Sequence, residues 1–366
     1  MVIMALDHTR DFFHLDAMSF SPEDLAKTNT LLFLTRWITH FCAPVFMFTA
    51  GTGAWLWLHS GPQSPARTLP QLSAHLWKRG LWLVLLELTA LRFAFFLSLT
   101  TGPVLLTVLW TLGWSMVALG FLVRMPLRWL TVLSLAVISL HNLADPIAAS
   151  RFGAFAGLWK VLHQQGAVVI NGVVSITVYP LVPWLAVMAA GYCFGPVLSL
   201  EPSRRRRWML QLGSCMTLAF LVLRTLNIYG DPLKWNGTLL SFLRVTKYPP
   251  SLDFLLMTLG PALLVLAVFD GRTFGKNNPL IVFGKAPLFY FLVHFSALHL
   301  LEFPLALLRY GKADFLWNPL PSMGGQTSLY PVGFGYPLWV VYLLWIFLVV
   351  ALYPLCLWFN NRKSRG

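Results

Sequence analysis

Residues 7–14 hold the densest group of side chains that could do chemistry. If this stretch is helical, Asp7, Asp11 and His14 stand at positions i, i+4 and i+7 and share one face. A carboxylate in line with an imidazole fixes its tautomer and raises its basicity, which general-base catalysis needs. Arg10 lies in the same run and could hold an anionic substrate group through two parallel hydrogen bonds. A charged, solvated helix end has the same pattern, and spacing alone does not separate these two interpretations.

Two apolar segments carry further titratable side chains. Arg36 and His40 are four residues apart and share a face of an expected helix. Ionisable groups within apolar helices normally face an interior cavity and take part in function, so both are candidates for binding a substrate. For Arg36 the alternative is structural, because its guanidinium could neutralise Asp7 or Asp11. His294, deep in a later apolar segment, is a third candidate of this kind.

Basic residues at expected helix breaks form another group of candidates. Lys247 and Tyr248 precede two prolines, whose fixed backbone makes a rigid entry to the next helix. Lys285 lies in a Gly-Lys-Ala-Pro break, where backbone amides and a lysine suit a phosphate. Glu87 and Arg92 are five residues apart and therefore on different faces, so we interpret them as packing ions.

The composition identifies the elements that must position these residues. Hydrophobic residues make up 57% of the chain and charged residues 11%, with a mean hydropathy of +0.68. A soluble protein has roughly 25% charged residues, and 11% cannot cover the surface of one this long. The 28 Phe and 16 Trp exclude disorder. The four cysteines lie in apolar runs without ligand spacing, so we expect neither disulfides nor a metal site.

Apolar segments long enough to cross a membrane recur along the whole chain. A spanning helix needs about 20 mostly apolar residues. Nine segments qualify: residues 31–58, 76–99, 103–123, 127–143, 173–198, 208–223, 251–269, 280–301 and 336–359. Residues 1–6 reach only about 9 Å as helix, and we interpret them as the outer end of a truncated first helix. The expected fold is an all-α polytopic transmembrane bundle, a single domain over residues 1–366.

The net charge of +14 is explained by where the basic residues lie. One set of alternate loops holds fifteen Lys and Arg: residues 61–79, 124–128, 201–207, 270–285 and 360–366. The other set holds fewer, together with most of the acids. The basic set is expected to be cytoplasmic, which accounts for the charge without nucleic acid as a partner. Seven of the nine histidines then lie toward the outer side: His8, His14, His40, His141, His163, His294 and His299.

Four segments resemble bacterial members of the heparan-α-glucosaminide N-acetyltransferase family of transmembrane acyltransferases. They are MVIMALDHTRDFFH from residue 1, FLTRWITHFCAPVFMFTAG from residue 33, TKYPPSLDFLLMTLGPALL from residue 246 and FGKAPLFYFLVHFSALHLL from residue 283. The resemblance implies about ten or eleven spans in the bacterial inner membrane. It implies transfer of an acetyl group from cytosolic acetyl-CoA, the acyl donor, to an extracytoplasmic amino sugar or glycan. The resemblance is also compatible with a homodimer.

The same resemblance assigns roles to individual residues. The catalytic histidine of the family falls on His14, with His8 as the competing position. Its polar partner falls on Asp7, where the animal enzyme has Asn, and Asp11 is a second candidate to orient the ring. His294 matches a histidine of the family. The implied chemistry is deprotonation of an amine or hydroxyl that attacks the thioester, or a covalent acetyl-imidazole.

The donor requires basic residues on the cytoplasmic side. The phosphates of coenzyme A need several positive contacts, for which Lys78, Arg79 and Lys285 are the candidates. The alternative function is a transporter or flippase, with Asp, Arg and His forming an intramembrane path. Transporters commonly have internal repeats, and the sequence has no convincing internal symmetry.

The charge distribution predicts the topology. A cysteine placed at Ser203 should resist a membrane-impermeant thiol reagent in intact cells, whereas one at Ser21 should be labelled, because the basic loops are retained in the cytoplasm. The expected C-terminus is also cytoplasmic. Strong labelling at position 203 with none at position 21 would reverse the orientation.

Overall fold

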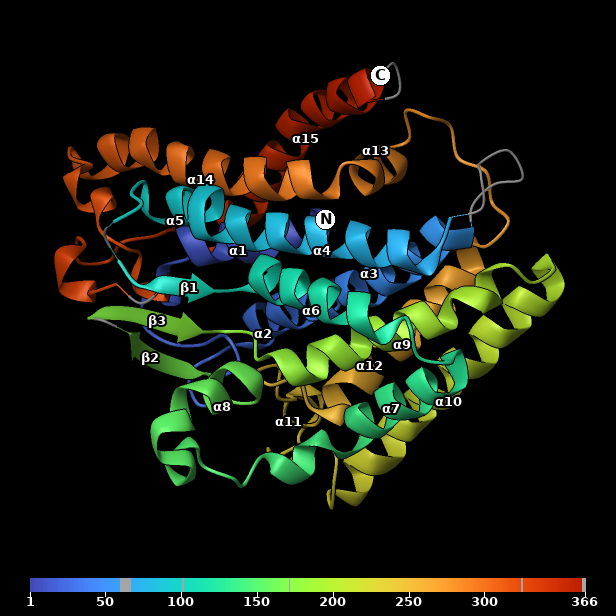
Figure 1. Cartoon of the computed structure of the whole chain (residues 1–366). Coiled ribbons are helices and arrows are strands. Elements are labelled where there is room, and N and C mark those ends of the chain that lie inside the picture. The colour runs from blue at the N-terminus through green and yellow to red at the C-terminus, as the bar shows by residue number, and fades with distance from the viewer. Residues whose placement is uncertain (60–66, 101, 171, 324, 364–366) are drawn as a thin grey trace. The chain divides into compact units, whose positions relative to one another are not determined.

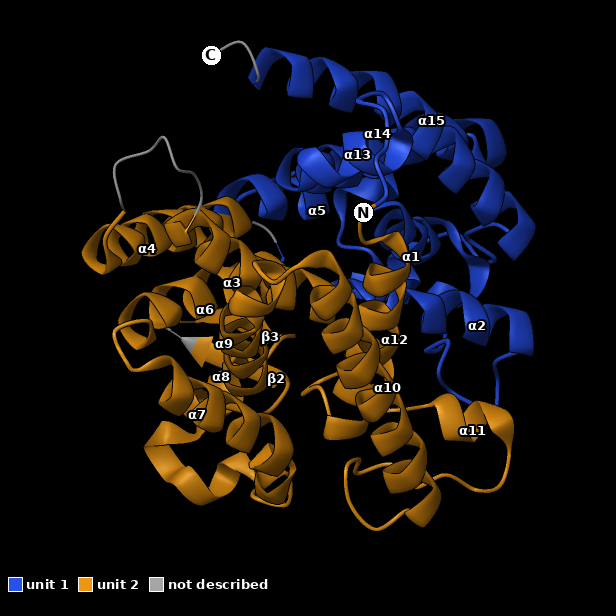
Figure 2. Ribbon diagram, turned by 90° about the vertical axis from the view of Figure 1, so that its right-hand side faces the viewer, with its two compact units in different colours: residues 1–42, 89–103, 272–366 blue, residues 43–88, 104–271 orange. Residues whose placement is uncertain are grey.

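The structure, a computed structural model, describes residues 1–59, 67–100, 102–170, 172–323 and 325–363. Parts of two expected cytoplasmic loops, residues 61–66 and 364–366, lie outside the described residues. The chain divides into two compact units, each assembled from separate stretches of sequence (Figure 2). Unit 1 consists of Met1–Cys42, Thr89–Pro103 and Arg272–Gly366, and unit 2 of Ala43–Leu88 and Val104–Gly271.

Seven helical segments of the described chain are long and apolar enough to cross a membrane. They are Thr30–His59, Leu127–Ala144, Leu181–Leu198, Pro202–Leu226, Leu252–Phe269, Pro287–Tyr310 and Leu338–Lys363. The expectation of a mainly helical, polytopic chain is therefore supported, and the number of nine spans is not confirmed. Val108–Leu122 is also apolar, but its 15 residues extend only about 22 Å.

Unit 1 is built around its first helix. Its helices are α1 (Val2–Phe13), α2 (Thr30–Thr39), α5 (Arg92–Phe96), α13 (Pro279–Lys285), α14 (Pro287–Tyr310) and α15 (Leu338–Lys363). Helix α1 packs against α2, α14 and α15, and Trp345 Nε1 donates to the carbonyl of Val2 at 2.9 Å. The expected span 280–301 is divided, because the chain turns at Ala286 and Pro287 begins a new helix.

Unit 2 contains the remaining helices and three strands (Figure 1). Its helices are α3 (Cys42–His59), α4 (Leu69–Leu86), α6 (Val108–Leu122), α7 (Leu127–Leu140), α8 (Ala156–Leu162), α9 (Leu181–Leu198), α10 (Pro202–Leu226), α11 (Leu239–Leu243) and α12 (Leu252–Phe269). The closest helix pairs are α4 with α6, α10 with α12, and α9 with both α6 and α7.

Glycines bring the helices of unit 2 together. A Cβ atom on Gly80 of α4 would overlap the carbonyl oxygen of Gly113 of α6, and the reverse substitution would overlap Gly80. Helices α3 and α9 meet in the same way, since a Cβ on Gly51 would overlap the Met188 carbonyl. In a bilayer, where apolar burial gives little driving force between helices, small residues allow backbones to approach and gain van der Waals contact.

Helix α4 begins before the expected span 76–99. Thr68 and Gln71 form a capping box, in which each side chain accepts a hydrogen bond from the backbone of the other. The helix therefore starts at Leu69. Lys78 and Arg79, which we expected in a loop, lie inside α4 and are exposed.

The middle of the expected span 76–99 is a π-helical turn, Glu87–Leu91, followed by the short helix α5. The buried Glu87 carboxylate accepts hydrogen bonds from the hydroxyl of Thr107 at 2.6 Å and from its backbone N–H at 3.0 Å. It also accepts from the backbone amides of Leu109 and Trp110, at 3.1 and 3.3 Å. Glu87 thus caps the N-terminus of α6 from another helix, which satisfies donors that the helix leaves unpaired.

A three-stranded sheet departs from the all-α expectation. Strands β1 (Val104–Leu106), β3 (Val173–Thr177) and β2 (Gly166–Ile170) lie in that order, with β1 parallel and β2 antiparallel to β3 (Figure 1). The expected spans 103–123 and 173–198 therefore begin with strands, and their helices start later. The sequence contains a signal for this hairpin, an Asn-Gly pair flanked by β-branched residues. Gly172 of this pair has a φ of +79°, a backbone conformation that glycine adopts readily.

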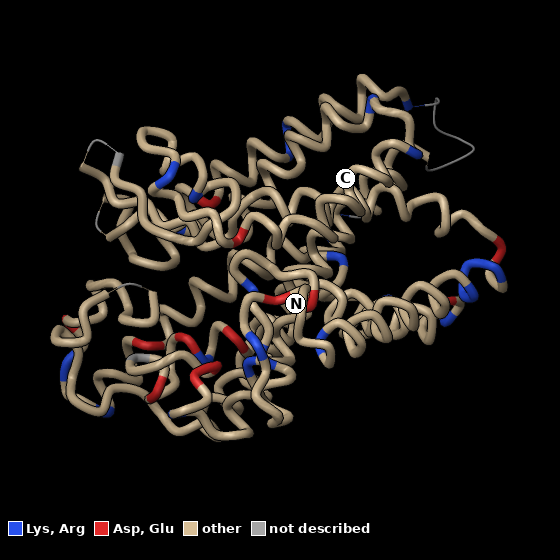
Figure 3. Tube along the Cα trace, turned by 90° about the horizontal axis from the view of Figure 1, so that it is seen from below, with Lys and Arg blue, Asp and Glu red and all other residues tan. Residues whose placement is uncertain are grey.

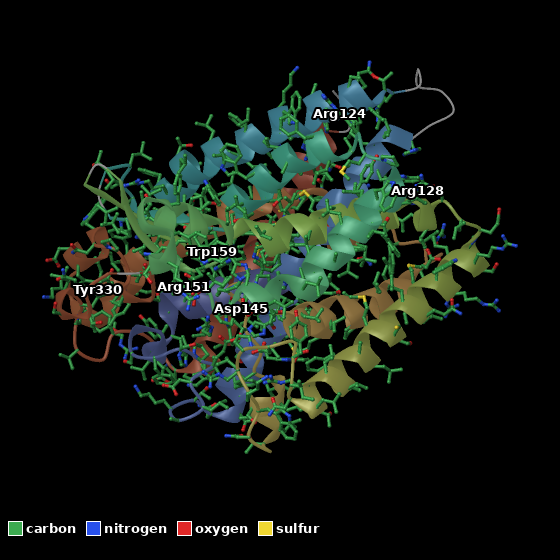
Figure 4. The ribbon with its side chains drawn as sticks, turned by 60° about the horizontal axis from the view of Figure 1, so that its bottom comes forward. Arg124, Arg128, Asp145, Arg151, Trp159 and Tyr330 are labelled. Atoms are coloured by element: carbon green, nitrogen blue, oxygen red, sulfur yellow. The ribbon has the colours of Figure 1, made fainter. Side chains whose placement is uncertain are left out.

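The segment between α7 and β2 is held by side-chain to backbone contacts. Figure 4 labels Asp145, Arg151 and Trp159 on this segment. The indole N–H of Trp159 donates to the carbonyl of Ile147 at 2.9 Å, and Nε2 of His163 lies 2.9 Å from Oδ1 of Asp145. His163 is buried by these contacts. We interpret it as a residue that orders this connection.

One end of the α10–α12 pair carries neighbouring basic and acidic residues (Figure 3). Arg205 donates from Nε to both carboxylate oxygens of Asp270, at 3.0 and 3.1 Å, and from Nη1 to the carbonyl of Leu198 at 3.3 Å. This arginine of the 204–207 run therefore joins the beginning of α10 to the end of α12. Its role is structural, independent of the side of the membrane on which it lies.

The glycine contacts predict a position-specific response to an added methyl group. Gly51→Ala should destabilise the protein by about 1–3 kcal/mol, because the Cβ can be accommodated only if α3 and α9 separate. Gly53→Ala is the matched control on the same helix, since nothing lies within 4 Å of its Cβ position, and it should be neutral or stabilising by up to ~1 kcal/mol. Thermal unfolding in detergent or nanodiscs measures both, and equal effects would contradict the close approach.

Candidate functional site

The polar centre of unit 1 is the carboxylate of Asp7 on α1. Asp7 is buried, with 7% of its surface exposed. Its Oδ1 accepts a hydrogen bond from Nη2 of Arg10 at 2.9 Å, and its Oδ2 accepts from Nη1 of Arg36 on α2. Arg10 also donates to Oδ1 of Asp11 at 2.6 Å. Two guanidinium groups thus share one buried carboxylate, and this charge pairing joins α1 to α2.

These contacts define what Arg10 and Arg36 do in the unit. We expected both as candidates for holding a substrate. The structure places Arg10 between two protein carboxylates and Arg36 on Asp7. This geometry matches the structural alternative for Arg36, in which its guanidinium neutralises Asp7 and stabilises the helix pair.

His40 pairs with an acid that the sequence analysis did not single out. Its Nε2 lies 2.7 Å from Oε1 of Glu23, in the loop before α2, and the imidazole is 1% exposed. His40 directly follows α2, at the turn into α3. Arg36 and His40 therefore bind different carboxylates. Helical spacing could not identify Glu23, because the partner comes from a loop 17 residues earlier in the chain.

His14 lies outside the helix that was expected to carry it. Helix α1 ends at Phe13, and His14 has extended backbone angles, so the predicted stripe of Asp7, Asp11 and His14 stops at Asp11. The physical reason is that the chain pairs with a loop here: the N–H of Tyr336 donates to the carbonyl of Phe13 at 2.7 Å. Among the described residues, no ion pair links His14 to Asp7 or Asp11.

The His14 ring is instead oriented by the backbone. Its Nδ1 accepts a hydrogen bond from the N–H of Asp16 at 3.2 Å, as an N-cap of the turn Leu15–Met18. The neutral ring in this contact carries its proton on Nε2. Burial lowers the pKa of His14 from its usual value, Asp16 opposes this shift and Arg10 adds to it. The imidazole is therefore held neutral, as an Nε2–H donor.

His8 and His294 meet between α1 and α14. Their ring centroids are 5.3 Å apart, and the His8 ring lies 4.2 Å from that of Phe295. Nδ1 of His8 is 3.7 Å from Oδ2 of Asp11, so of the two candidate histidines it is the one beside a carboxylate. His294 is fully buried, and its Nδ1 donates to the carbonyl of Tyr290 at 2.9 Å.

The hydrogen bond to Tyr290 fixes the tautomer of His294. A ring that donates from Nδ1 keeps a lone pair on Nε2, and Nε2 has no hydrogen-bond partner among the described residues. His14 and His294 are thus opposite in kind, the first a donor and the second an acceptor at Nε2. This difference could not be read from the sequence, because backbone contacts create it.

Lys247 and Tyr248 belong to unit 2. Nζ of Lys247 lies 5.1 Å from the centroid of the Tyr248 ring, whose hydroxyl donates to that of Tyr179 at 3.2 Å. The loop that carries them is fixed by Asp231, whose carboxylate accepts from Thr246 N–H at 2.7 Å and from the Ser251 hydroxyl at 2.5 Å. Burial raises the pKa of Asp231, and these hydrogen bonds oppose the shift. Sequence analysis missed Asp231.

The three candidates for the donor phosphates lie in different units. Lys78 and Arg79 are exposed on α4 in unit 2, and Lys285 is exposed at the end of α13 in unit 1. Within unit 1, contacts link Asp7, Arg10, Asp11, Arg36, His8 and His294. His14 and His40 belong to the same unit but contact Asp16 and Glu23. Unit 2 holds Lys247 and Tyr248. Among the described residues, no group of three or more His, Cys, Asp or Glu is placed to hold a metal ion.

The chain matches the model of one known protein family. A family model described as heparan-alpha-glucosaminide N-acetyltransferase, catalytic, matches residues 1–230. No curated protein and no solved structure matched the chain. The matched residues include α1 and α2 with the Asp7 charge cluster, whereas Lys247, Tyr248, Lys285 and His294 lie beyond them.

The Asp7 cluster predicts a large stability difference between neighbouring acids. Asp7→Asn should destabilise the protein by about 3–5 kcal/mol, because it removes the charge shared by the buried guanidinium group of Arg10 and the half-buried one of Arg36. Asp11→Asn is the control. Its side chain is 27% exposed, and its loss should cost no more than about 1 kcal/mol. Thermal unfolding of both variants measures this, and an equal loss would show that Asp7 is not the centre of the cluster.

Proposed function

The chain belongs to the heparan-α-glucosaminide N-acetyltransferase family, and on this premise we propose that it moves an acetyl group from cytosolic acetyl-CoA across the membrane. The proposed acceptor is the amine of an extracytoplasmic amino sugar or glycan. The observation that carries the proposal is the family match over residues 1–230, which includes the charged end of α1. The proposed location is the bacterial inner membrane, with the C-terminus in the cytoplasm.

The proposed reaction is aminolysis of a thioester. The amine nitrogen attacks the thioester carbonyl, the new C–N bond forms and the C–S bond breaks. A histidine takes the proton that the amine loses and returns it to the leaving CoA thiolate. In a covalent variant, the histidine nitrogen first takes the acetyl group and then passes it to the amine.

His14 is the proposed catalytic residue, on the resemblance to the family. In its neutral form its Nε2–H suits donation to the oxyanion that develops on the thioester oxygen. It can act as a base only when the ring releases the N–H of Asp16. His294 is the second proposed residue, supported by the unpartnered lone pair at Nε2, which suits a base or a nucleophile. His8, which is in contact with His294, remains the competing histidine of α1.

The donor is proposed to bind through basic side chains. Lys78, Arg79 and Lys285 are all exposed and are the candidates for the phosphates of coenzyme A. Lys247 and Tyr248 are proposed to contact the acceptor. Arg10, Arg36 and His40 also remain proposed contacts of the acceptor, and Arg10 and Arg36 in addition position α1 and α2 through Asp7.

The test is transfer of radiolabel from acetyl-CoA to glucosamine or to a periplasmic glycan extract, with purified protein in nanodiscs. His14→Ala should reduce the transfer rate by about 10²–10⁴, while calorimetric titration with acetyl-CoA gives an unchanged Kd. His59→Ala is the control, because its ring stacks on Trp55 and no role in the reaction is proposed for it.

The outcomes separate the candidate histidines. Full activity in His14→Ala with loss in His8→Ala would show that the second histidine of α1 is the catalytic one. Loss only in His294→Ala would place the chemistry on α14. If the wild-type protein neither binds acetyl-CoA at millimolar concentration nor transfers label, the acetyltransferase assignment is wrong.

The pH dependence follows from the neutral state of His14. Protonation would place a charge on a ring that burial holds neutral, and the lowered pKa postpones this step to a lower pH. The transfer rate should therefore persist as the pH falls through about 6.5, the usual histidine pKa, and decline only below it. A decline centred above 6.5 in wild type would contradict the role of a buried, neutral His14.

A further inference from the structure

Glu302 is a buried carboxyl group that the fold leaves unused. It lies on α14 in unit 1 and is 2% exposed. Neither carboxylate oxygen has a hydrogen-bond partner among the described residues, and no ion pair there includes it. Asp7, by contrast, accepts from two guanidinium groups, and Glu87 accepts four hydrogen bonds. Asp253 is intermediate, since its Oδ1 has no hydrogen-bond partner among the described residues but its Oδ2 lies 4.0 Å from Nη1 of Arg224.

An acid without a donor lowers the stability of the protein. A carboxyl group gives up its hydration on burial, and that free energy is not regained unless donors replace the water. Buried polar groups that form no hydrogen bonds within the protein are found mainly at functional sites. Packing therefore does not account for a glutamate at position 302, whose two oxygens have no donor from the described chain.

The turns of α14 on either side of Glu302 contact residues at or beside the end of α1. One turn earlier on α14, the His299 ring lies 5.7 Å from that of Phe12. One turn later, the carbonyl of Leu305 accepts a hydrogen bond from the Tyr336 hydroxyl at 3.2 Å. The backbone of Tyr336 pairs with that of His14. Contacts on both sides of Glu302 thus lead to the segment that carries His14.

A cluster of aromatic residues lies within electrostatic reach of Glu302 through Tyr330. Phe315, Tyr330 and Phe334 pack in mutual contact, with centroid distances of 5.1–5.4 Å. Tyr330, labelled in Figure 4, lies within electrostatic reach of Glu302: burial raises the pKa of its phenol, and Glu302 adds to the shift. An apolar, aromatic surrounding strengthens the attraction between a carboxylate and a cation.

The chemistry of the group defines its ligand. Two unpartnered oxygens suit a ligand that brings positive charge and several N–H donors, which a primary ammonium group does. A neutral hydroxyl brings one donor and no charge. A metal ion would need further ligands, and the described residues supply no group of three.

We propose that Glu302 is the residue that binds the amino group of the acceptor and so distinguishes it from a hydroxyl. This inference rests on the proposed acetyltransferase function. The bound ammonium group first gives up one proton to the Glu302 carboxylate, because only the neutral amine can attack the thioester, and Glu302 releases that proton to water afterwards. The acetylated product is a neutral amide, which has no charge to pair with the carboxylate. Glu302 therefore favours the substrate over the product, and the product leaves when the acetyl group has been transferred.

Binding measurements test this without any catalytic step. Wild-type protein in nanodiscs should bind glucosamine at least tenfold more tightly than N-acetylglucosamine or glucose by calorimetric titration, since hydrogen bonds to charged groups are the stronger ones. In Glu302→Gln the affinity for glucosamine should fall about 10- to 100-fold, to the level of the two neutral sugars. Wild-type protein that binds all three equally would overturn the proposal.

Stability provides the matched comparison. Glu302→Gln removes an acid that makes no hydrogen bond within the described chain, so its midpoint of thermal unfolding should equal or exceed that of wild type. Glu87→Gln, the control, disturbs the cap of α6 and should unfold at lower temperature while glucosamine affinity stays unchanged. If Glu302→Gln lowers the unfolding temperature and leaves the glucosamine affinity intact, Glu302 is structural and the proposal fails.

Kinetics distinguish this inference from the proposed function. In the radiolabel assay, Glu302→Gln should raise KM for glucosamine and leave KM for acetyl-CoA unchanged. An active enzyme with an unchanged KM for glucosamine in this variant would refute the role of Glu302 alone. A wild-type protein that prefers glucosamine in binding but never transfers label would refute the acetyltransferase and leave the ammonium site standing.

Discussion

The need to satisfy buried carboxylates shapes both units of this protein. With 13 acids in 366 residues, most of the surface apolar and several helices long enough to cross a bilayer, each buried acid must find its donors within the chain. Asp7 joins α1 to α2 through two arginines, and Glu87 supplies the N-terminal cap of α6. Asp231 fixes the loop that carries Lys247. The acids thus act as connectors between segments, whereas Glu302 has no partner for either oxygen among the described residues, which suggests a ligand.

Features that depend on the length of apolar runs or on single charged residues could be predicted from the sequence. The polytopic, mainly helical nature of the chain and its family follow from the distribution of apolar runs and from four short segments. The pairing of Arg36 with Asp7 was one of two alternatives, because a buried arginine needs an acid. These features are predictable since each depends on the type of one or two residues.

Features that depend on contacts between distant segments were not predictable. His14 leaves the helix because Tyr336, more than 300 residues later, pairs with the end of α1. His40 has its partner in a loop, and residues 104–106 form a strand because β3 lies beside them. An apolar run of this length fits a strand or the start of a helix equally well, and tertiary pairing decides between them.

Unit 1 is assembled from segments that lie far apart in the sequence, and this has a consequence for its biosynthesis. Helix α1 emerges from the ribosome with α2, but its other neighbours, α14 and α15, are more than 200 residues downstream. At the usual 5–20 residues per second, roughly 10–50 s separate the synthesis of these elements. During that interval α14 and α15 do not yet exist, whereas α2 already does. Asp7 pairs with Arg10 and Arg36, which are made at about the same time. The negative charge of Asp7 can therefore be neutralised in the nascent chain before α14 is synthesised and completes the unit.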